Sequence, residues 1–329
     1  MTDDTKQNIR RTIVVRSRDF VMKGYLLYRY RGKGGEVVIP EYVRCMREGI
    51  FRDNEAVMSV VIPNTVKVIP KECFCHCTSL RRVTLPEGVR IENGAFAWCY
   101  NLKDIENLDK ASYIGPHSIM ATAIESITFP AHQEVIENST LLKCAHLKSV
   151  KLGENVKKIC ENVFYDVDSL ESIHIPRGVT EIAKNFGCVP ELKEFTVDEN
   201  NPVFYAKDGV LYRRYKKGDT LVRFPENKKD VDKIIIDCYR IGSGAFNAYY
   251  APSADIIISD NVKVIEDVAF RDTCVNSITI GRGVESIAKY SLIVAVNKPV
   301  TVYVYKGSYA ESAVREICKE NEDIILCVI

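Results

Sequence analysis

Apolar residues recur along the chain in pairs that lie five residues apart, and the second member is often Phe. Successive first members differ by 23, 22, 23, 22, 23, 23, 59, 24 and 22 residues. A register held over most of the chain predicts a repeat protein whose units stack on one another. The pairs are Met46/Phe51, Ile69/Phe74, Ile91/Phe96, Ile114/Ile119, Ile136/Leu141, Ile159/Phe164, Ile182/Phe186 (spaced by four), Ile241/Phe246, Ile265/Phe270 and Ile287/Leu292.

Each unit also carries a triplet that alternates apolar, outward, apolar, as a half-buried strand does. Examples are Val83-Thr84-Leu85, followed by Pro86, and Ile173-His174-Ile175, followed by Pro176. A single unit of this length cannot bury its own apolar side, so stacking must do so, with one strand per repeat forming a parallel sheet. The prediction is a β-rich α/β solenoid with that sheet on one face and short helical turns and extended segments on the other.

The single interval of 59 residues exceeds one repeat by 59 − 23 = 36 residues, which indicates an insertion within the repeats. Turn signals at Asp208-Gly209 and Lys217-Gly218-Asp219 divide it into strand-like segments, so we interpret it as a β-hairpin module. The segment Gly24–Tyr28 resembles Gly209–Tyr212, which indicates a related hairpin at the N-terminus. We therefore predict one solenoid domain, 1–329, with an N-terminal hairpin cap (1–36), repeats (37–197), an inserted hairpin (198–230), further repeats (231–298) and a C-terminal cap (299–329).

Charge and composition exclude several classes of protein. Lys and Arg number 45 against 44 Asp and Glu, a balance that argues against nucleic-acid binding. No apolar run approaches the roughly 18–20 residues of a membrane span. The first eleven residues are polar and do not resemble a signal peptide, so we expect a cytoplasmic protein, or an extracellular or cell-surface one if a leader has been removed.

The pattern L-x-x-V-x-I-P followed by V-x-x-I-x-x-x-A-F-x-x-C closely resembles the BspA-type leucine-rich repeat family. The strongest matches are Leu80–Cys99 and Leu170–Cys188, and the tail from Val302 resembles the closing segment of that family, with a short helix and a final strand at Ile324–Val328. The resemblance implies a leucine-rich repeat solenoid and a non-enzymatic interaction module, often on bacterial cell surfaces. The repeat LKDIENLDKASYIGPHSIM lacks the usual Pro and Phe, so we expect local irregularity there.

Two groups of residues are candidates for chemistry. Cys73, Cys75, His76 and Cys77 are of the types that bind zinc, although Cys73 and Cys77 also occupy repeat positions that favour a small buried residue. Cys144 and His146 lie close together, but Cys144 is again a repeat position. We expect core thiols at these repeat positions, and we predict no cofactor, no metal site and no enzymatic activity.

A binding surface is the better hypothesis, and the outward residues of the triplets form its candidate column on the face expected to be concave. Ile235 and Ile257 differ from the polar members, because an apolar outward pair needs a cover. The inserted hairpin, with Phe204, Tyr205, Tyr212 and Phe224, is the favoured cover, and a partner protein is the alternative. The column comprises Val61, Thr84, Thr128, Lys151, His174, Thr196, Ile235, Ile257 and Thr279.

The sequence thus predicts a module that binds a protein or another cell-surface macromolecule, not nucleic acid, through its sheet and inserted hairpin. A structural or adhesive cell-surface protein is the alternative. A metal-binding protein built on Cys73–Cys77 is a third hypothesis.

Overall fold

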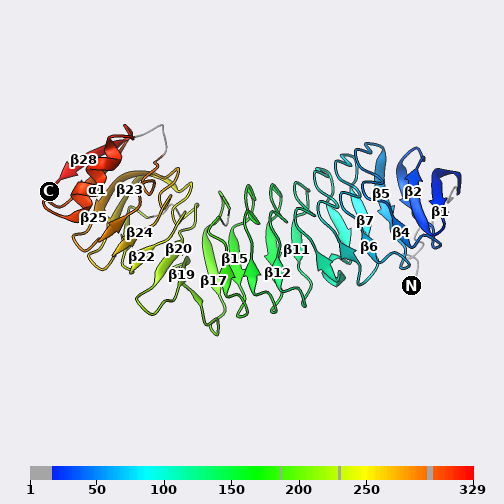
Figure 1. Cartoon of the computed structure of the whole chain (residues 1–329), viewed down its shortest axis with the longest axis horizontal. Coiled ribbons are helices and arrows are strands. Elements are labelled where there is room, and N and C mark those ends of the chain that lie inside the picture. Colours follow the sequence, from blue (N-terminus) through cyan, green and yellow to red (C-terminus); the bar gives the residue numbers. More distant parts are fainter. Residues whose placement is uncertain (1–16, 186, 229–230, 295–298) are drawn as a thin grey trace, which may run out of the picture.

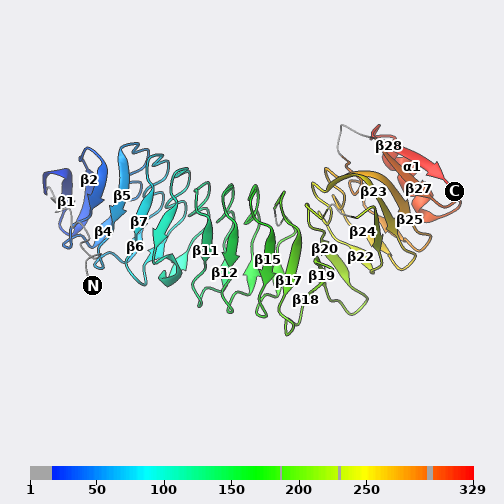
Figure 2. The same ribbon diagram turned by 180° about the vertical axis from the view of Figure 1, so that it is seen from behind.

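The computed structural model describes residues 17–185, 187–228, 231–294 and 299–329 and shows one elongated, shallowly curved solenoid. The first described strand, β1, and the last, β28, lie at opposite ends of this body (Figure 1). Each rung lies beside the rung that precedes it in sequence, so most contacts join residues about one repeat apart (Figure 2). The predicted solenoid of stacked repeats is confirmed.

The triplets form a row of parallel strands, as predicted, and most neighbouring strands in it pair with each other. Val60 pairs with Val83, and Val83 pairs with Ile105, each one repeat further along. Hydrogen-bonded pairing is interrupted between β9 and β11, between β13 and β15, and between β17 and β21. The triplet strands are β3 (Gly35–Val38), β5 (Val57–Val61), β7 (Arg82–Thr84), β9 (Asp104–Glu106), β11 (Ser126–Thr128), β13 (Ser149–Lys151), β15 (Ser172–Ile175), β17 (Glu194–Val197), β21 (Lys233–Ile236), β23 (Tyr250–Ile258), β25 (Cys274–Ile280), β27 (Val300–Val304) and β28 (Ile324–Val328).

A second ladder runs beside the first, and the prediction of one strand per repeat is wrong in this respect. The first member of each apolar pair and the residue before it form a two-residue strand. Their backbone groups stack in register on the preceding rung, as Arg90-Ile91 does on Val68-Ile69. These strands are β4 (Cys45–Met46), β6 (Val68–Ile69), β8 (Arg90–Ile91), β10 (Tyr113–Ile114), β12 (Val135–Ile136), β14 (Lys158–Ile159), β16 (Glu181–Ile182), β22 (Arg240–Ile241), β24 (Val264–Ile265) and β26 (Ser286–Ile287).

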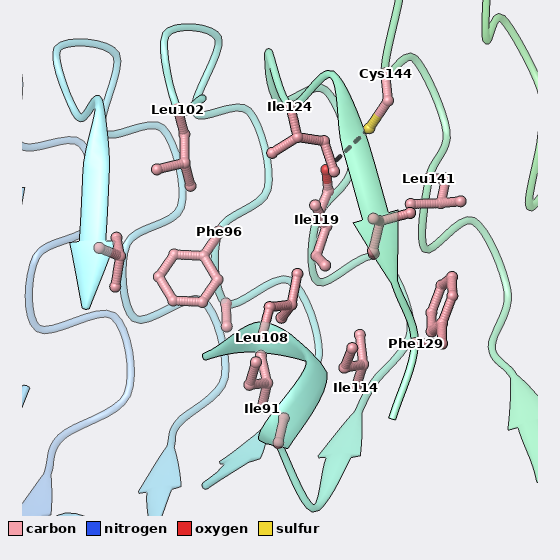
Figure 3. Packing of buried hydrophobic residues seen from close by; sticks show 14 of the residues in the cluster. Ile91, Phe96, Leu102, Leu108, Ile114, Ile119, Ile124, Phe129, Leu141 and Cys144 are labelled. Atoms are coloured by element: carbon pink, nitrogen blue, oxygen red, sulfur yellow. Dashed lines mark hydrogen bonds between the residues drawn. The ribbon is translucent and has the colours of Figure 1, made fainter. Parts of the chain in front are cut away.

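The Phe positions form stacked columns inside the solenoid. Phe74 lies 5.3 Å from Phe96 between ring centroids, with planes 5° apart, and Phe51 lies 4.9 Å from Phe74. The spacing follows the roughly 4.8 Å rise between neighbouring strands. All the described members of the apolar pairs are buried except Ile182; Phe186 lies outside the described residues. Figure 3 shows Phe96 among the isoleucines and leucines of neighbouring rungs.

Most outer turns contain two residues with positive φ, two positions before and two positions after the second member of the apolar pair; the turn around Leu292 is an exception. Around Phe96 these are Gly94 (φ 62°) and Trp98 (φ 62°). Where a side chain occupies such a site the backbone is strained, most of all for a β-branched residue such as Val268 (φ 49°), two positions before Phe270. Each turn is closed by backbone hydrogen bonds between residues three apart, as from the N–H of Cys77 to the carbonyl of Phe74 at 3.1 Å.

The repeat predicted to be irregular contains the 3-10 helix η2 (Leu108–Lys110), which follows Asn107 in a left-handed conformation. The second ladder is interrupted beside it, between β10 and β12, and the side chain of Gln133 bridges the gap. Its amide oxygen accepts from the N–H of Ile114 at 3.1 Å, and its amide nitrogen donates to the carbonyl of the same residue at 3.0 Å. A buried side-chain amide thus replaces a missing backbone pair.

Antiparallel units open both halves of the second ladder. After the 3-10 turn η1 (Ser17–Asp19), β1 (Phe20–Lys23) and β2 (Leu26–Tyr30) form a hairpin, and β2 pairs in parallel with β4. The insertion has three strands, one more than the predicted hairpin: β18 (Phe204–Lys207), β19 (Val210–Arg213) and β20 (Thr220–Arg223), with β20 parallel to β22. These three strands are called the inserted unit below. The first sixteen residues of the predicted N-terminal cap lie outside the described residues.

The chain ends with α1 (Tyr309–Cys318) and β28, the helix and strand that the tail predicts. The side chain of Ser308 caps the helix by accepting from the N–H of Glu311 at 3.2 Å, and Ala310, Val314 and Ile317 bury one face of it. This helix closes the last rungs of the solenoid.

Candidate interaction surfaces

The structure brings the nine predicted surface residues together in four groups. Pairing in register joins Val61 to Thr84, Thr128 to Lys151, His174 to Thr196, and Ile235 through Ile257 to Thr279. Between these groups the ladder is not hydrogen-bonded. The predicted alignment on one face is therefore found, as a series of short segments.

Polar residues in the first part of this face bind their counterparts on the next rung. The Thr84 hydroxyl donates to a Glu106 carboxylate oxygen at 2.8 Å, and His174 Nδ1 lies 2.9 Å from the Thr196 hydroxyl. Much of the hydrogen-bonding capacity here is already used within the protein.

The apolar part of the face is open to solvent. The expectation that the inserted hairpin covers Ile235 is wrong: its side chain is 64% exposed, and Ile257 on the next rung is partly exposed. Of the four aromatic residues expected to form the cover, Phe204 and Phe224 are buried in the core, whereas Tyr205 and Tyr212 line a hollow beside Ile235.

The inserted unit stands beside this open isoleucine surface. The rings of Tyr205 and Tyr212 stack with centroids 5.3 Å apart, and the Tyr205 hydroxyl donates to Asp219 at 2.7 Å. Burial, and after it the hydrogen bond to Asp219, raises the pKa of Tyr205. Burial also raises the pKa of Tyr212, to about 12. A hollow of about 240 Å³ separates these tyrosines from Ile235.

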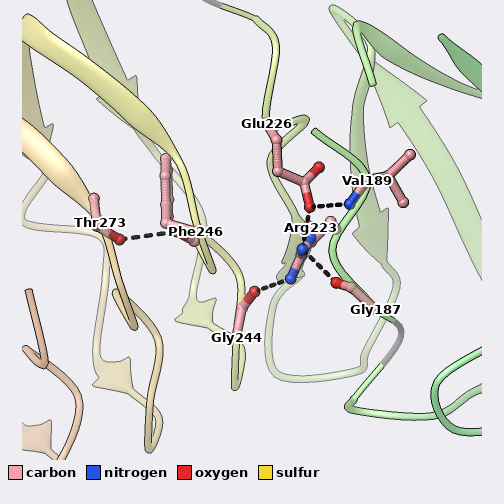
Figure 4. Close-up of polar contacts among 7 residues, drawn as sticks. All are labelled: Gly187, Val189, Arg223, Glu226, Gly244, Phe246 and Thr273. Atoms are coloured by element: carbon pink, nitrogen blue, oxygen red, sulfur yellow. Dashed lines mark hydrogen bonds and ion pairs between the residues drawn. The ribbon is translucent and has the colours of Figure 1, made fainter. Parts of the chain in front are cut away.

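A buried ion pair holds the inserted unit in place, and sequence reasoning did not find it. Arg223 and Glu226 are 4% and 2% exposed and form an ion pair (Figure 4). The Arg223 guanidinium also donates to the carbonyls of Gly187 at 2.6 Å and Gly244 at 2.7 Å, and the N–H of Val189 donates to Glu226 at 3.2 Å. The pair therefore ties the rung before the insertion to the rung after it.

Burial raises the pKa of the Glu226 carboxyl, and the neighbouring guanidinium of Arg223 offsets part of that rise. One Glu226 oxygen and the Arg223 Nε have no hydrogen-bond partner. Two opposite charges three residues apart are common in protein sequences, so this spacing does not indicate a buried ion pair. Only the fold shows that both side chains are buried.

The repeat cysteines are structural hydrogen-bond donors. The thiol of Cys77 donates to the Phe51 carbonyl at 3.0 Å, and that of Cys99 donates to the Phe74 carbonyl at 3.0 Å. The thiol of Cys144 likewise donates to the Ile119 carbonyl at 3.3 Å (Figure 3). At the equivalent position of a later repeat, the hydroxyl of Thr273 donates to the Phe246 carbonyl at 2.8 Å. A hydrogen bond to Cys77 and burial raise the pKa of the Cys99 thiol well above its usual range, and burial raises that of Cys144. The thiols of Cys99 and Cys144 therefore stay protonated and are poor nucleophiles.

The two residues of the cysteine cluster that lie outside the repeat positions pack along the turns. Cys75 contacts Ala97 and Met120 in a small apolar cluster, and the ring of His76 stacks on Trp98 at 5.8 Å, with planes 7° apart. Within the described ranges, no group of three or more His, Cys, Asp or Glu side chains is placed to hold a metal ion. The same part of the chain contains no helix both long and apolar enough to cross a bilayer.

Comparison with known proteins identifies the family of this repeat architecture. The family model described as "BspA type Leucine rich repeat region (6 copies)" matches residues 33–119, 77–188, 112–208 and 226–295. No curated protein matches the chain.

Solved structures with the same fold come from bacteria. A leucine rich cell surface protein from Faecalibacterium prausnitzii is 23% identical with a TM-score of 0.70, and the alignment covers 88% of this chain and 86% of that one. The pneumococcal vaccine antigen PcpA is 15% identical with a TM-score of 0.55 over 94% and 96% of the two chains. A leucine-rich repeat protein from Eubacterium ventriosum is 21% identical with a TM-score of 0.51 over 85% and 68%. At these identities the likeness concerns the fold alone.

Proposed function

The chain belongs to the BspA-type leucine-rich repeat family, and we propose that it is a non-enzymatic module that binds a protein, or another macromolecule, through its triplet face and inserted unit. The observation that carries the proposal is the exposure of Ile235, 64% open to solvent beside Ile257 on the next rung. Contiguous exposed apolar residues on a rigid sheet are typical of interaction sites.

The surroundings of this pair support a protein partner. Lys233 and Asp237, exposed on the same strand or next to it, give the isoleucines a polar rim, and Tyr205 and Tyr212 line the adjacent hollow. Protein interfaces combine an apolar centre, aromatic side chains and a polar rim in this way. Further along the triplet face, expected to be the concave one, the exposed side chain of Lys151 would add a polar contact.

The absence of enzymatic activity is proposed on chemical grounds. Nucleophilic catalysis requires an activated thiol or hydroxyl beside a base. The thiol of Cys144, near His146 in sequence, is fully buried and hydrogen-bonded to a backbone carbonyl. Binding would depend on shape and polar complementarity alone.

Capture from the native host tests the proposal. The wild type and an Ile235→Lys/Ile257→Lys variant are immobilised, and bound proteins are quantified by mass spectrometry. Val68→Lys serves as a matched control, because Val68 is 41% exposed and lies on the second ladder. We expect a specific partner that is retained by the wild type and the control and reduced at least tenfold with the double variant. Equal capture by all three would remove the isoleucine surface from consideration.

A structural or adhesive role on the cell surface is the second candidate. It is favoured by the F. prausnitzii structure, which is that of a cell surface protein. Protease treatment of intact host cells separates the two locations: loss of the protein supports the surface role, whereas complete protection contradicts it.

A further inference from the structure

The second ladder contains a cavity of about 510 Å³ at the place where the insertion interrupts it. β16 forms one wall, β19 and β20 of the inserted unit form another, and the rung of β22 closes a third side. Ile182, the member of the apolar pairs that is not fully buried, lines this space. The cavity therefore exists because β20 of the inserted unit, and not a strand of a regular repeat, is the next neighbour of β16 along the second ladder.

The wall is largely apolar and includes Ile182, Phe204, Leu211 and Val222. Its volume lies within the roughly 300–1,000 Å³ of small-molecule sites. An apolar, partly enclosed space of this size suits the body of a small organic ligand, and it is distinct from the isoleucine surface on the triplet ladder.

Positive charge dominates the rim. Glu266 is the acidic residue of the lining, and it is already engaged by Arg240 at 2.9 Å and by Lys184 at 3.5 Å. Arg213, Lys216 and Lys217 also line the cavity, and within the described residues none of the three forms an ion pair; the Arg213 guanidinium lies over the rings of Phe204 and Tyr215. Three cations without counter-charges beside an apolar space favour an anionic ligand.

The position of the basic turn is fixed by close packing. Gly218 has a φ of 127°, and a Cβ built on it would lie 2.4 Å from the Cβ of Tyr239. Only glycine fits there, so Lys216 and Lys217 are held at the mouth of the cavity.

Buried polar groups in the wall lack partners. Thr220 is 7% exposed and Arg223 is 4% exposed, and neither the Thr220 hydroxyl nor the Arg223 Nε has a hydrogen-bond partner. Both residues line the cavity. Buried donors are almost always satisfied in native proteins, so unsatisfied ones in a cavity wall point to a ligand that accepts from them.

We propose that this cavity binds a small organic anion, a carboxylate on an aromatic or aliphatic body, with the body against Phe204 and Leu211 and the carboxylate facing Arg213 and Lys217. The proposal does not rest on the binding of a macromolecular partner at the isoleucine surface.

Isothermal titration of the full chain with matched probes tests the charge requirement. The probes are 4-phenylbutyrate, 4-phenylbutanol and 4-phenylbutylamine, with octanoate and indole-3-acetate as further anions. We expect 1:1 binding of at least one anion, and affinity for 4-phenylbutanol and 4-phenylbutylamine at least tenfold weaker than for 4-phenylbutyrate. Absence of saturable binding by all three anions, or equal affinity for the charged and neutral probes, would overturn the proposal.

Variants then locate the site. Lys216→Glu/Lys217→Glu changes only exposed side chains, so it should fold normally and weaken anion binding at least tenfold. Ala183→Trp should block the cavity by filling it, and circular dichroism verifies that the variant is folded. Lys207→Gln, an exposed lysine on β18 outside the cavity lining, is the matched control and should bind like the wild type. Unchanged binding by both test variants, or tighter binding of a polyglutamate peptide than of every small anion, would contradict the assignment.

Discussion

The Arg223–Glu226 ion pair makes a sharp prediction about how the inserted unit is held. Changing Arg223 to Met removes the guanidinium and leaves the Glu226 carboxylate buried without its counter-ion. It also removes the donors to Gly187 and Gly244. Breaking a buried ion pair by removing one partner costs about 3–5 kcal/mol, and the buried carbonyls left without a donor contribute to that loss. Glu226→Met should cost a similar amount, because it leaves the guanidinium charge uncompensated.

The double variant distinguishes an ion pair from two independent contacts. Once Arg223 is absent, Glu226 is an uncompensated buried charge, so replacing it with Met should be neutral or stabilising. We therefore expect R223M/E226M to be no less stable than R223M alone. Urea unfolding followed by circular dichroism measures the free energies. A repeat protein can unfold in parts, and its urea transition is then not two-state. Hydrogen exchange at the amide of Val189, which donates to Glu226, therefore measures the local stability around the ion pair.

The effect should also depend on pH. Because burial raises the pKa of Glu226 in the folded state above its unfolded value of roughly 4.3, the folded protein binds this proton more tightly than the unfolded chain does. Stability from this group is complete below about pH 4 and decreases as the pH rises through the folded pKa. The R223M variant should accordingly lose less stability at pH 4 than at pH 8. Additive losses in the double variant, or a loss independent of pH, would refute this account of the pair.

Other predictions concern the repeats. Phe96→Ala should lower the free energy of unfolding by about 3–5 kcal/mol, since it opens a cavity in the Phe column, and urea unfolding measures this; a loss below about 1 kcal/mol would contradict it. Gln133→Ala should cost about 1–3 kcal/mol in the same assay, because it leaves the buried backbone groups of Ile114 unpaired, and a neutral result would show that the bridge is dispensable. Val268→Asn should raise stability by up to about 1 kcal/mol by relieving a β-branched residue of positive φ, whereas a decrease would indicate that its packing outweighs the strain. Cys45, the exposed cysteine, should react first with a thiol reagent, and Cys45→Ser should remove that fast phase; rapid labelling that persists would count against burial of the repeat thiols.

The sequence predicts the solenoid well because its evidence is periodic. Every repeat places its apolar pair at the same two positions of the rung. The burial of Phe74 or Ile136 therefore follows from the repeat spacing alone. The second ladder was missed because a two-residue strand has no alternation to detect. The left-handed turn residues were missed because side chains as different as those of Trp98 and Val268 occupy them.

The candidate sites were harder to predict because they arise where the periodicity fails. The sequence singled out Ile235 as an apolar outward residue, but only the folded structure shows that the inserted unit leaves its side chain exposed. The cavity beside Ile182 depends on how the inserted unit replaces a rung. Such features combine segments far apart in the sequence, and no local pattern contains them.

The two antiparallel openings suggest how a chain of this kind is assembled. β2 leads into β4 and β20 leads into β22 by the same parallel pairing, and a second apolar core begins at Val210. The protein thus resembles two shorter solenoids in tandem, the second with its own starter. Recombination at such a junction would exchange entire halves without disturbing the stacking within either, which offers a route by which length and surface diversify together.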